Sequence, residues 1–347
     1  MVAIPTSLRN EAPVILEAEH VSRHFSAGGS FLPWTHRGVV HAVDDVTLQL
    51  RPGRITALVG ESGSGKSTVA RVLARLYPPT TGRILFQGEN VLTWRGRRAR
   101  AYRRQVQMIF QDPFSSLNPV KRVEYVLSRP LLVHHIVPAH RVRERVHELL
   151  TTVGLVPAAE FAAKYPHQLS GGQRQRVAIA RALAVEPAVL LADEPISMLD
   201  VSIRMGILNL MLDLKQRMNL AFLYITHDVA SARYVADEII VMYAGHVVER
   251  GETLTVLRAP QHPYTRLLLS AVPNPAAGLT RQRLEGRGEV RTIVDPPPGC
   301  RFVSRCPLAE DVCARTTPEL VESGPDRWVR CHLYPRSTGP QGRVSHD

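Results

Sequence analysis

The order of apolar and polar positions predicts strands that alternate with helices over most of the chain. Short apolar runs indicate strands, and residues 39–50 partly alternate as in a half-buried strand. The strands expected in this way are residues 14–25, 39–50, 55–59, 83–87, 189–192 and 221–226. Apolar residues at helical spacing predict helices at 69–76 and 141–153. This alternation favours an α/β fold with a mainly parallel sheet.

Prolines and glycines divide this pattern into segments. Helical pieces separated by prolines fill residues 113–168, between two of the sheet strands, and predict a helical subdomain. A second boundary falls near Pro260 and Pro263, and a proline run at 296–298 introduces the last segment. We therefore expect a tail at 1–13, an α/β domain at 14–258 and an extension at 259–347.

Composition and charge exclude only a few functional classes. The chain has 347 residues, 44% of them hydrophobic, and a formal net charge of +12. The densest basic stretch, residues 95–104, has no aromatic pattern of a nucleic-acid module, so we expect a solvated helical face and no nucleic-acid partner. Because no run of eighteen apolar residues and no leader pattern occurs, we expect a cytosolic protein.

Residues 55–68 carry the strongest chemical signal. An apolar strand is followed by Gly60, four residues and Gly65-Lys66-Ser67, and a helix comes next. This spacing is the phosphate loop of nucleoside triphosphatases, whose backbone N–H groups surround phosphate oxygens. Lys66 is expected on the β- and γ-phosphates and the Ser67 hydroxyl on Mg²⁺. The expected nucleotide-binding residues of this loop are Gly60, Ser62, Gly63, Gly65, Lys66, Ser67 and Thr68.

A second glycine motif, Leu169-Ser170-Gly171-Gly172-Gln173, precedes a helix far along the chain. A helix N-terminus of this kind binds anions, and one nucleotide does not need both motifs, so each chain is expected to offer its second motif to a nucleotide held by another chain. With this motif the chain resembles the ATPases of ATP-binding cassette (ABC) transporters, whose signature is Leu-Ser-Gly-Gly-Gln. The resemblance covers residues 14 to about 258. It implies a P-loop cassette in which an antiparallel β part and a helical subdomain accompany the mainly parallel sheet, followed by a small cysteine-containing extension.

The resemblance implies roles for further residues in chain order. Phe25 corresponds to the aromatic residue that stacks on adenine, and Gln111 to the Q-loop residue that contacts the metal or the attacking water. Asp193 would hold Mg²⁺, and the adjacent Glu194 would deprotonate the water. The catalytic set implied is Glu194, His227 and Gln111. The residues implied to bind ATP across the dimer are Ser170, Gly171, Gly172, Gln173 and Asp200.

Three features resemble the ATPases of dipeptide, oligopeptide and nickel importers. They are the sequence of residues 111–119, the segment of residues 262–268 and the cysteines of the extension. Cys300, Cys306, Cys313 and Cys331 are the four cysteines of the sequence, and a cytosolic protein rarely forms disulfides. Their spacing lacks the Cys-x-x-Cys of many zinc sites and does not select a metal. The resemblance implies a 4Fe–4S cluster, and zinc or free thiols stay open as alternatives.

The expected function is hydrolysis of ATP to power peptide import through a membrane permease. The resemblance implies a second ATPase subunit, preferably a different chain, together with two permease subunits and an extracellular substrate-binding protein. The protein would then lie peripherally on the cytoplasmic face of the cell membrane. Import of nickel or oligosaccharides is the alternative within the family. A non-transport ABC ATPase acting on nucleic acid or ribosomes is the alternative outside it.

Overall fold

The computed structural model describes residues 13–26, 38–112, 116–270 and 294–334. Residues 1–12 of the expected tail and residues 113–115 of the expected Q-loop segment lie outside these ranges. Within the described ranges, every helix is either too short or too polar to cross a membrane.

The centre of the molecule is a large sheet with a parallel core. Its strand order is β11-β12-β10-β9-β3-β8-β7-β6, and the five strands from β9 to β6 run parallel. Strands β3, β7 and β8 are buried along their whole length, as expected for strands covered on both faces. The strands are β3 (Ile55–Val59), β6 (Val106–Ile109), β7 (Val189–Asp193), β8 (Ala221–Thr226), β9 (Glu238–Tyr243), β10 (His246–Glu252), β11 (Val321–Gly324) and β12 (Arg327–Val329).

A smaller antiparallel sheet covers the first helix. Its order is β2-β1-β4-β5, and its apolar side chains share a core with α1 (Lys66–Leu73) and one face of the large sheet. These strands are β1 (Leu16–Ser26), β2 (Val39–Leu50), β4 (Thr81–Phe86) and β5 (Glu89–Asn90). The predicted α/β fold, with a parallel core and an antiparallel part, is confirmed.

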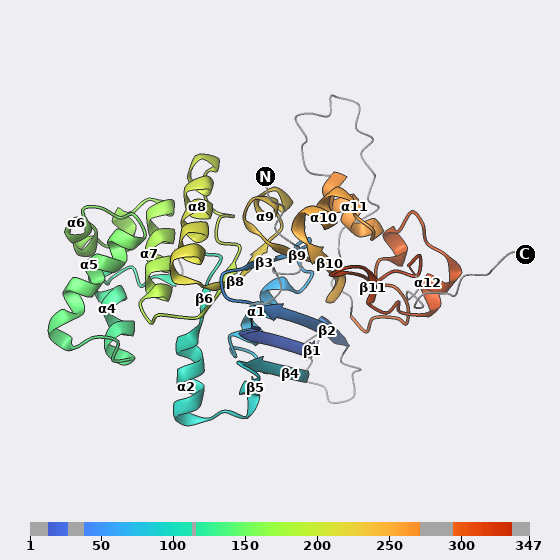
Figure 1. Ribbon diagram of the computed structural model, residues 1–347, viewed down its shortest axis with the longest axis horizontal. Helices are drawn as coiled ribbons and strands as arrows, with labels where there is room; N and C mark the ends of the chain where they lie inside the picture. Colours follow the sequence, from blue (N-terminus) through green and yellow to red (C-terminus); the bar gives the residue numbers. More distant parts are fainter. Residues whose placement is uncertain (1–12, 27–37, 113–115, 271–293, 335–347) are drawn as a thin grey trace, which may run out of the picture.

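The helices expected between the strands are present (Figure 1). Helices α4 to α7 lie at one end of the molecule and the extension lies at the other. The other α-helices of the described ranges are α2 (Gly96–Gln105), α4 (Val123–Val133), α5 (Val142–Thr152), α6 (Ala158–Ala163), α7 (Gly171–Leu183), α8 (Val201–Met218), α9 (Val229–Val235), α10 (Thr253–Arg258), α11 (Pro263–Ser270) and α12 (Asp311–Arg315).

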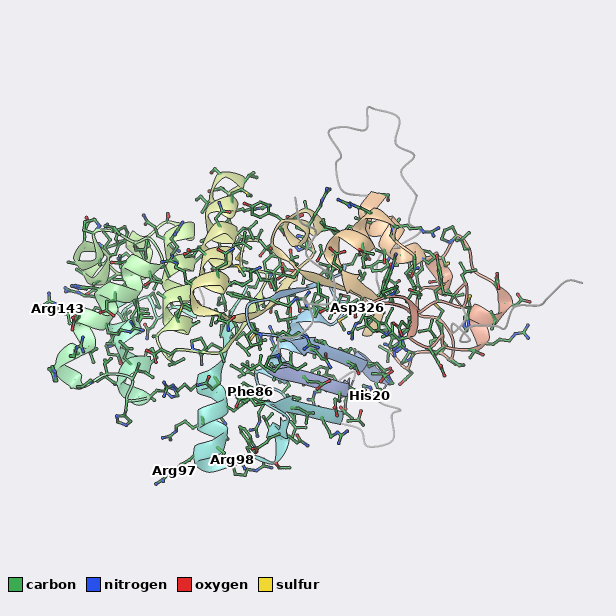
Figure 2. The ribbon with its side chains drawn as sticks, in the orientation of Figure 1. His20, Phe86, Arg97, Arg98, Arg143 and Asp326 are labelled. Carbon is green, nitrogen blue, oxygen red and sulfur yellow. The ribbon has the colours of Figure 1, made fainter. Side chains whose placement is uncertain are left out.

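The basic stretch at 95–104 forms α2, and most of its arginines are exposed. Arg97 points outward from this helix (Figure 2), and Arg98, also exposed, pairs with Glu89 and lies over the Trp94 ring. Only Ala99 and Tyr102 are buried on it, and the Tyr102 hydroxyl donates to the Leu73 carbonyl at 2.6 Å. The prediction of a solvated helical face is confirmed.

The extension is joined to the large sheet through a buried acidic residue. Glu249 of β10 has no exposed surface, and its carboxylate accepts hydrogen bonds from the backbone N–H groups of Gln261 and His262, each at 2.9 Å. Arg327 of β12 donates to the same carboxylate at 2.8 Å, and β12 pairs antiparallel with β10. A buried carboxylate is stable only when it is paired in this way. Glu249 therefore joins the start of the extension and β12 to strand β10.

Candidate nucleotide site

The phosphate loop follows β3 and leads directly into α1. At Gly65 the backbone has φ +104°, and an added Cβ would lie 2.0 Å from the Ala42 carbonyl oxygen. At Gly60 an added Cβ would lie 2.2 Å from the Met242 carbonyl oxygen. Both positions therefore require glycine, which lets the loop curl against β2 and β9.

Lys66 is held inside the loop. Its ammonium donates to the carbonyl oxygens of Gly60 and Glu61, both at 2.8 Å. Burial lowers the pKa of Lys66, while the carboxylates of Glu194 and Asp193 act in the opposite direction. The side chain is thus buried and positioned beside the carboxylates, where a phosphate would meet it.

Ser67 and Asp193 provide an oxygen pair that fits Mg²⁺. The Ser67 hydroxyl donates to Asp193 Oδ1 at 2.8 Å, so the two oxygens lie side by side between α1 and the end of β7. Burial raises the pKa of Asp193. A buried carboxylate next to a hydroxyl is the hard-oxygen environment that Mg²⁺ prefers. Ser67 and Asp193 would hold the ion, with the Gln111 carboxamide oxygen as a third donor.

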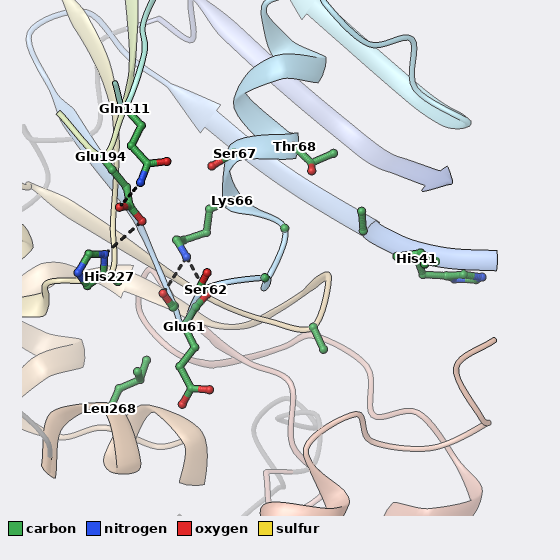
Figure 3. A pocket seen from close by; sticks show the side chains of 16 residues that line it. His41, Glu61, Ser62, Lys66, Ser67, Thr68, Gln111, Glu194, His227 and Leu268 are labelled. Carbon is green, nitrogen blue, oxygen red and sulfur yellow. Dashed lines mark hydrogen bonds and ion pairs between the residues drawn. The ribbon is translucent and has the colours of Figure 1, made fainter. Parts of the chain in front are cut away.

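Glu194 lies between Gln111 and His227 (Figure 3). The Gln111 amide donates to Glu194 Oε2 at 3.2 Å, and His227 Nδ1 lies 3.2 Å from Glu194 Oε1. Glu194 has φ +46°, an uncommon backbone conformation for a side chain of this size and typical of functional sites. The three predicted catalytic residues, from three separate strand ends, are thus brought together at one edge of the sheet.

These groups line a cavity of about 680 Å³, large enough for a nucleotide. Every residue predicted from the phosphate loop and the catalytic set lines it. Ala244 and Leu268 line it as well, and sequence analysis missed both. The predicted residues on its wall are Gly60, Ser62, Gly63, Gly65, Lys66, Ser67, Thr68, Gln111, Glu194 and His227.

Phe25 is not part of this wall. Its ring makes an edge contact with Tyr77 at 5.6 Å between centroids, and the Arg23 guanidinium lies over it at 4.5 Å. His41 of the neighbouring strand lines the cavity instead, with its ring stacked on His24 at 3.8 Å. Adenine stacking on Phe25 stays a prediction.

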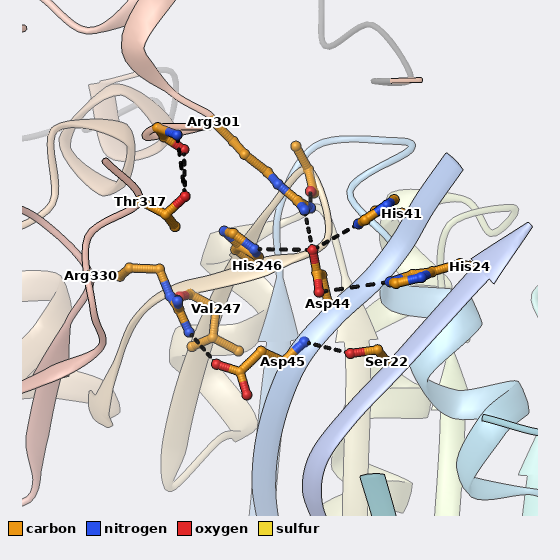
Figure 4. Close-up of polar contacts among 12 residues, drawn as sticks. Ser22, His24, His41, Asp44, Asp45, His246, Val247, Arg301, Thr317 and Arg330 are labelled. Atoms are coloured by element: carbon orange, nitrogen blue, oxygen red, sulfur yellow. Dashed lines mark hydrogen bonds and ion pairs between the residues drawn. The ribbon is translucent and has the colours of Figure 1, made fainter. Parts of the chain in front are cut away.

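The His24–His41 pair belongs to a polar cluster centred on Asp44 (Figure 4). His41 Nδ1 lies 3.0 Å from Asp44 Oδ2, and Arg301 of the extension contacts the same oxygen. His246 lies 3.5 Å from this oxygen as well, and burial lowers the pKa of His246 to about 4. The cluster joins the extension to β2 beside the cavity.

The signature motif caps α7, away from this cavity. Ser170 is the N-cap, its hydroxyl accepts from the Gln173 N–H at 3.3 Å, and the Gln173 side chain accepts from the Ser170 N–H at 3.0 Å. An added Cβ at Gly172 would lie 2.5 Å from Ile203, whereas at Gly171 it would be in ordinary contact. Ser170 and Asp200 are exposed, and none of these residues lines the chain's own cavity.

The four cysteines of the extension come together although they lie on separate segments. The Cys300 N–H donates to the Cys313 carbonyl at 2.7 Å, and Cys300 and Cys306 are packed against the main core. Burial raises the pKa of Cys300 to about 11 and raises the pKa of Cys306 and Cys331, and each thiolate would raise the pKa of its neighbours further. Such unpaired, partly buried thiols fit metal ligation, which stabilises the thiolate.

Comparison with known proteins decides the family. The family model described as ABC transporter matches residues 43–197, and the model described as oligopeptide/dipeptide transporter, C-terminal region, matches residues 248–313. The oligopeptide transport ATP-binding protein AppF of Bacillus subtilis is 42% identical over 92% of this chain and 97% of its own length. The chain belongs to the ATP-binding proteins of ABC transporters.

Other relatives agree with this assignment. The dipeptide transport ATP-binding protein DppF of Escherichia coli is 39% identical over 94% of this chain and 96% of its own length. Among solved structures, the dimeric post-hydrolysis state of the ATP-binding cassette MJ0796, bound to ADP and Pi, is 28% identical. It aligns with a TM-score of 0.60 over 69% of this chain and 99% of that chain. As a member of this family the ABC protein described here binds ATP and is an ATPase.

Proposed function

We propose that this chain is the ATP-hydrolysing subunit that powers import of peptides through a membrane ABC permease. The observation that carries the proposal is the cavity in which Lys66, Glu194 and His227 converge, on a chain 39% and 42% identical to dipeptide and oligopeptide transport ATP-binding proteins. The proposed division is a cassette at 14–258, with its helical subdomain at about 113–168, and an extension at 259–347.

In the proposed reaction, water attacks the γ-phosphorus of ATP, the bond from this phosphorus to the bridging β-phosphate oxygen breaks, and ADP leaves. The proton of the water passes to a carboxylate oxygen of Glu194. His227 and Gln111, each 3.2 Å from that carboxylate, hold it in place. Lys66 balances the charge of the β- and γ-phosphates. Mg²⁺ held by Ser67, Asp193 and Gln111 would supply further positive charge.

A second cassette completes the pocket in this proposal. Ser170, Gly171, Gly172, Gln173 and Asp200 of one subunit would contact the nucleotide on the other. Support comes from the exposed position of Ser170 and Asp200 and from the similarity to a dimeric cassette. The N-terminus of α7 would direct its N–H groups at the γ-phosphate. We propose a heterodimer of two related chains rather than a homodimer.

The proposed contact with the permease lies on the helical subdomain, next to residues 111–118. A groove of about 660 Å³ opens there, with several exposed apolar side chains on its wall. Apolar grooves between helices are typical docking sites for a partner helix. The chain would bind two permease subunits peripherally at the cytoplasmic face, and an extracellular binding protein would deliver the peptide. The residues that support this placement are Val120, Tyr125, Leu132, Val142 and Tyr165.

We propose that the four cysteines hold a 4Fe–4S cluster. The support is their convergence from separate segments of the extension, together with their lack of disulfide bonds. The resemblance to the peptide-importer ATPases favours the cluster over zinc.

Transport by the assembled system tests the proposed function. The two ATPases, the permease and the binding protein would be reconstituted in liposomes. Uptake of a labelled dipeptide and a labelled pentapeptide would be measured with ATP supplied on the side of the membrane that carries the ATPases. We expect ATP-dependent uptake that stops when Glu194 is replaced by Gln in this chain. ATP-driven uptake of a nickel chelate or an oligosaccharide, with no peptide uptake, would contradict the proposal.

A further inference from the structure

The phosphate loop carries one acidic side chain, Glu61, directly after Gly60. A carboxylate at this position is a problem for the site, because ATP brings several negative charges to the same loop. Residue 61 also lies beside Lys66, whose ammonium already donates to the backbone carbonyl of Glu61. A free carboxylate here would compete with phosphate for that ammonium.

The extension removes this carboxylate from the loop. Arg305 binds Glu61 through two hydrogen bonds, from Nη1 to Oε2 at 2.8 Å and from Nη2 to Oε1 at 3.1 Å. The Glu61 carboxylate accordingly points away from Lys66 (Figure 3). A two-point guanidinium–carboxylate contact is the strongest form of this ion pair and fixes the direction of both groups.

Arg305 is itself held rigidly. Its side chain is 9% exposed, against 29% for Glu61, and its guanidinium lies over the rings of Tyr243 at 5.7 Å and Phe302 at 5.9 Å. The guanidinium of an arginine is always charged in proteins, so the charge of Arg305 does not depend on pH. The pair therefore differs from a flexible surface ion pair, which would contribute little to stability.

Two further contacts join the extension to the same loop. The Tyr264 hydroxyl accepts the Glu61 N–H at 2.8 Å, and the Tyr264 ring has no exposed surface. Arg301 donates to the Ala244 carbonyl, and the next residue, Gly245, donates its N–H to the Ser64 carbonyl at 2.9 Å. The extension thus contacts the loop directly through Glu61 and indirectly through Ser64.

We propose that Arg305 of the extension is a positioning residue of the ATP site, which keeps the Glu61 carboxylate away from Lys66 and the phosphates. Without Arg305 the carboxylate turns to Lys66 and weakens ATP binding. Through Arg305 the extension then positions a side chain of the nucleotide site. The proposal uses the ATP site of the proposed function but not its cargo, and a test by nucleotide binding is independent of what is transported.

The test is the dissociation constant of Mg-ATP for the full chain and three variants. Arg305→Gln should weaken binding roughly tenfold, the effect of about one lost charge interaction near the site. Glu61→Gln should bind at least as tightly as the unchanged chain, because no carboxylate is left to compete. The double variant should return to within about threefold of the unchanged chain, since both partners of the pair are gone.

The sign of the Glu61 effect separates this role from mere support of the fold. A purely structural contact would make both single variants weaker, so weak binding by Glu61→Gln or by the double variant overturns the proposal. Unchanged binding by Arg305→Gln overturns it as well. In the assembled transporter, Arg305→Gln should raise KM for ATP with kcat at saturating ATP nearly unchanged.

Two further variants control for folding. Arg315 pairs with Asp311 in the same extension, but both side chains are exposed, at 77% and 95%, so Arg315→Gln should bind ATP like the unchanged chain. Arg305→Lys keeps the charge and should bind within about threefold of it. If Arg305→Gln does not fold, weak ATP binding by a folded, charge-reversed Arg305→Glu together with near-normal binding by Arg305→Lys and Glu61→Gln supports the pairing. Normal binding by a charge-reversed Arg305→Glu overturns it.

Discussion

Replacing Glu194 by Gln tests the proposed catalytic arrangement most directly. The change keeps the size of the side chain and removes its charge, and with it the ability to take a proton from water. The two neighbours of Glu194 contact it at 3.2 Å each, at the long end of hydrogen-bond distances, so the ground-state loss is small. A tenfold change in affinity corresponds to about 1.4 kcal/mol of binding free energy, and the loss expected here is smaller. ATP affinity should therefore stay within about threefold of the unchanged chain.

The rate should respond very differently. A positioned general base contributes about 10²- to 10⁴-fold, which corresponds to about 3–5 kcal/mol of the barrier. The assay is phosphate release by the assembled transporter at saturating ATP, with ATP binding measured in parallel. Glu160→Gln on α6, an exposed residue paired with Lys164, is the matched control. A kcat within threefold of the unchanged transporter would show that Glu194 is not the base.

Three other predictions follow from named contacts. Gly171→Val should leave the melting temperature and ATP binding of the single chain unchanged, because an added Cβ would lie 3.5 Å from Leu199, an ordinary contact distance. The same change should lower the ATPase activity of the assembly at least tenfold, and equal activity would contradict the shared pocket. Burial lowers the pKa of His262 from 6.5 to about 3, so the unfolded chain gains a proton that the folded chain does not. The free energy of unfolding should fall by about 1.4 kcal/mol per pH unit below pH 6.5. In His262→Gln the free energy of unfolding, measured with urea between pH 7 and 5, should depend less steeply on pH. Protein purified without oxygen should be brown and contain iron, with less iron in Cys313→Ser; a colourless, iron-free protein would contradict the cluster.

The parts of the site that lie close together in sequence were predictable from sequence alone. The phosphate loop depends on a local order of strand, glycines and helix, and the structure has this order from Ile55 to Leu73. The two carboxylates after Ala192 could be placed because a buried apolar run ends there. In such cases a short stretch of sequence determines both the backbone and the chemistry.

Contacts between distant segments could not be predicted in this way. Arg305 and Glu61 are 244 residues apart, and nothing in the pattern around either residue indicates the other. The same holds for Glu249, whose three partners all come from the extension.

The pairing of β12 with β10 has a consequence for how the chain tolerates shortening. Strand β10 would otherwise be the last strand on its side, with backbone N–H and C=O groups open to any extended peptide. Strand β12 occupies those groups, and the short β11 ends the row. A protein cut after residue 258 would keep its nucleotide loop but expose this row, so it should self-associate at micromolar concentrations where the intact chain stays in solution.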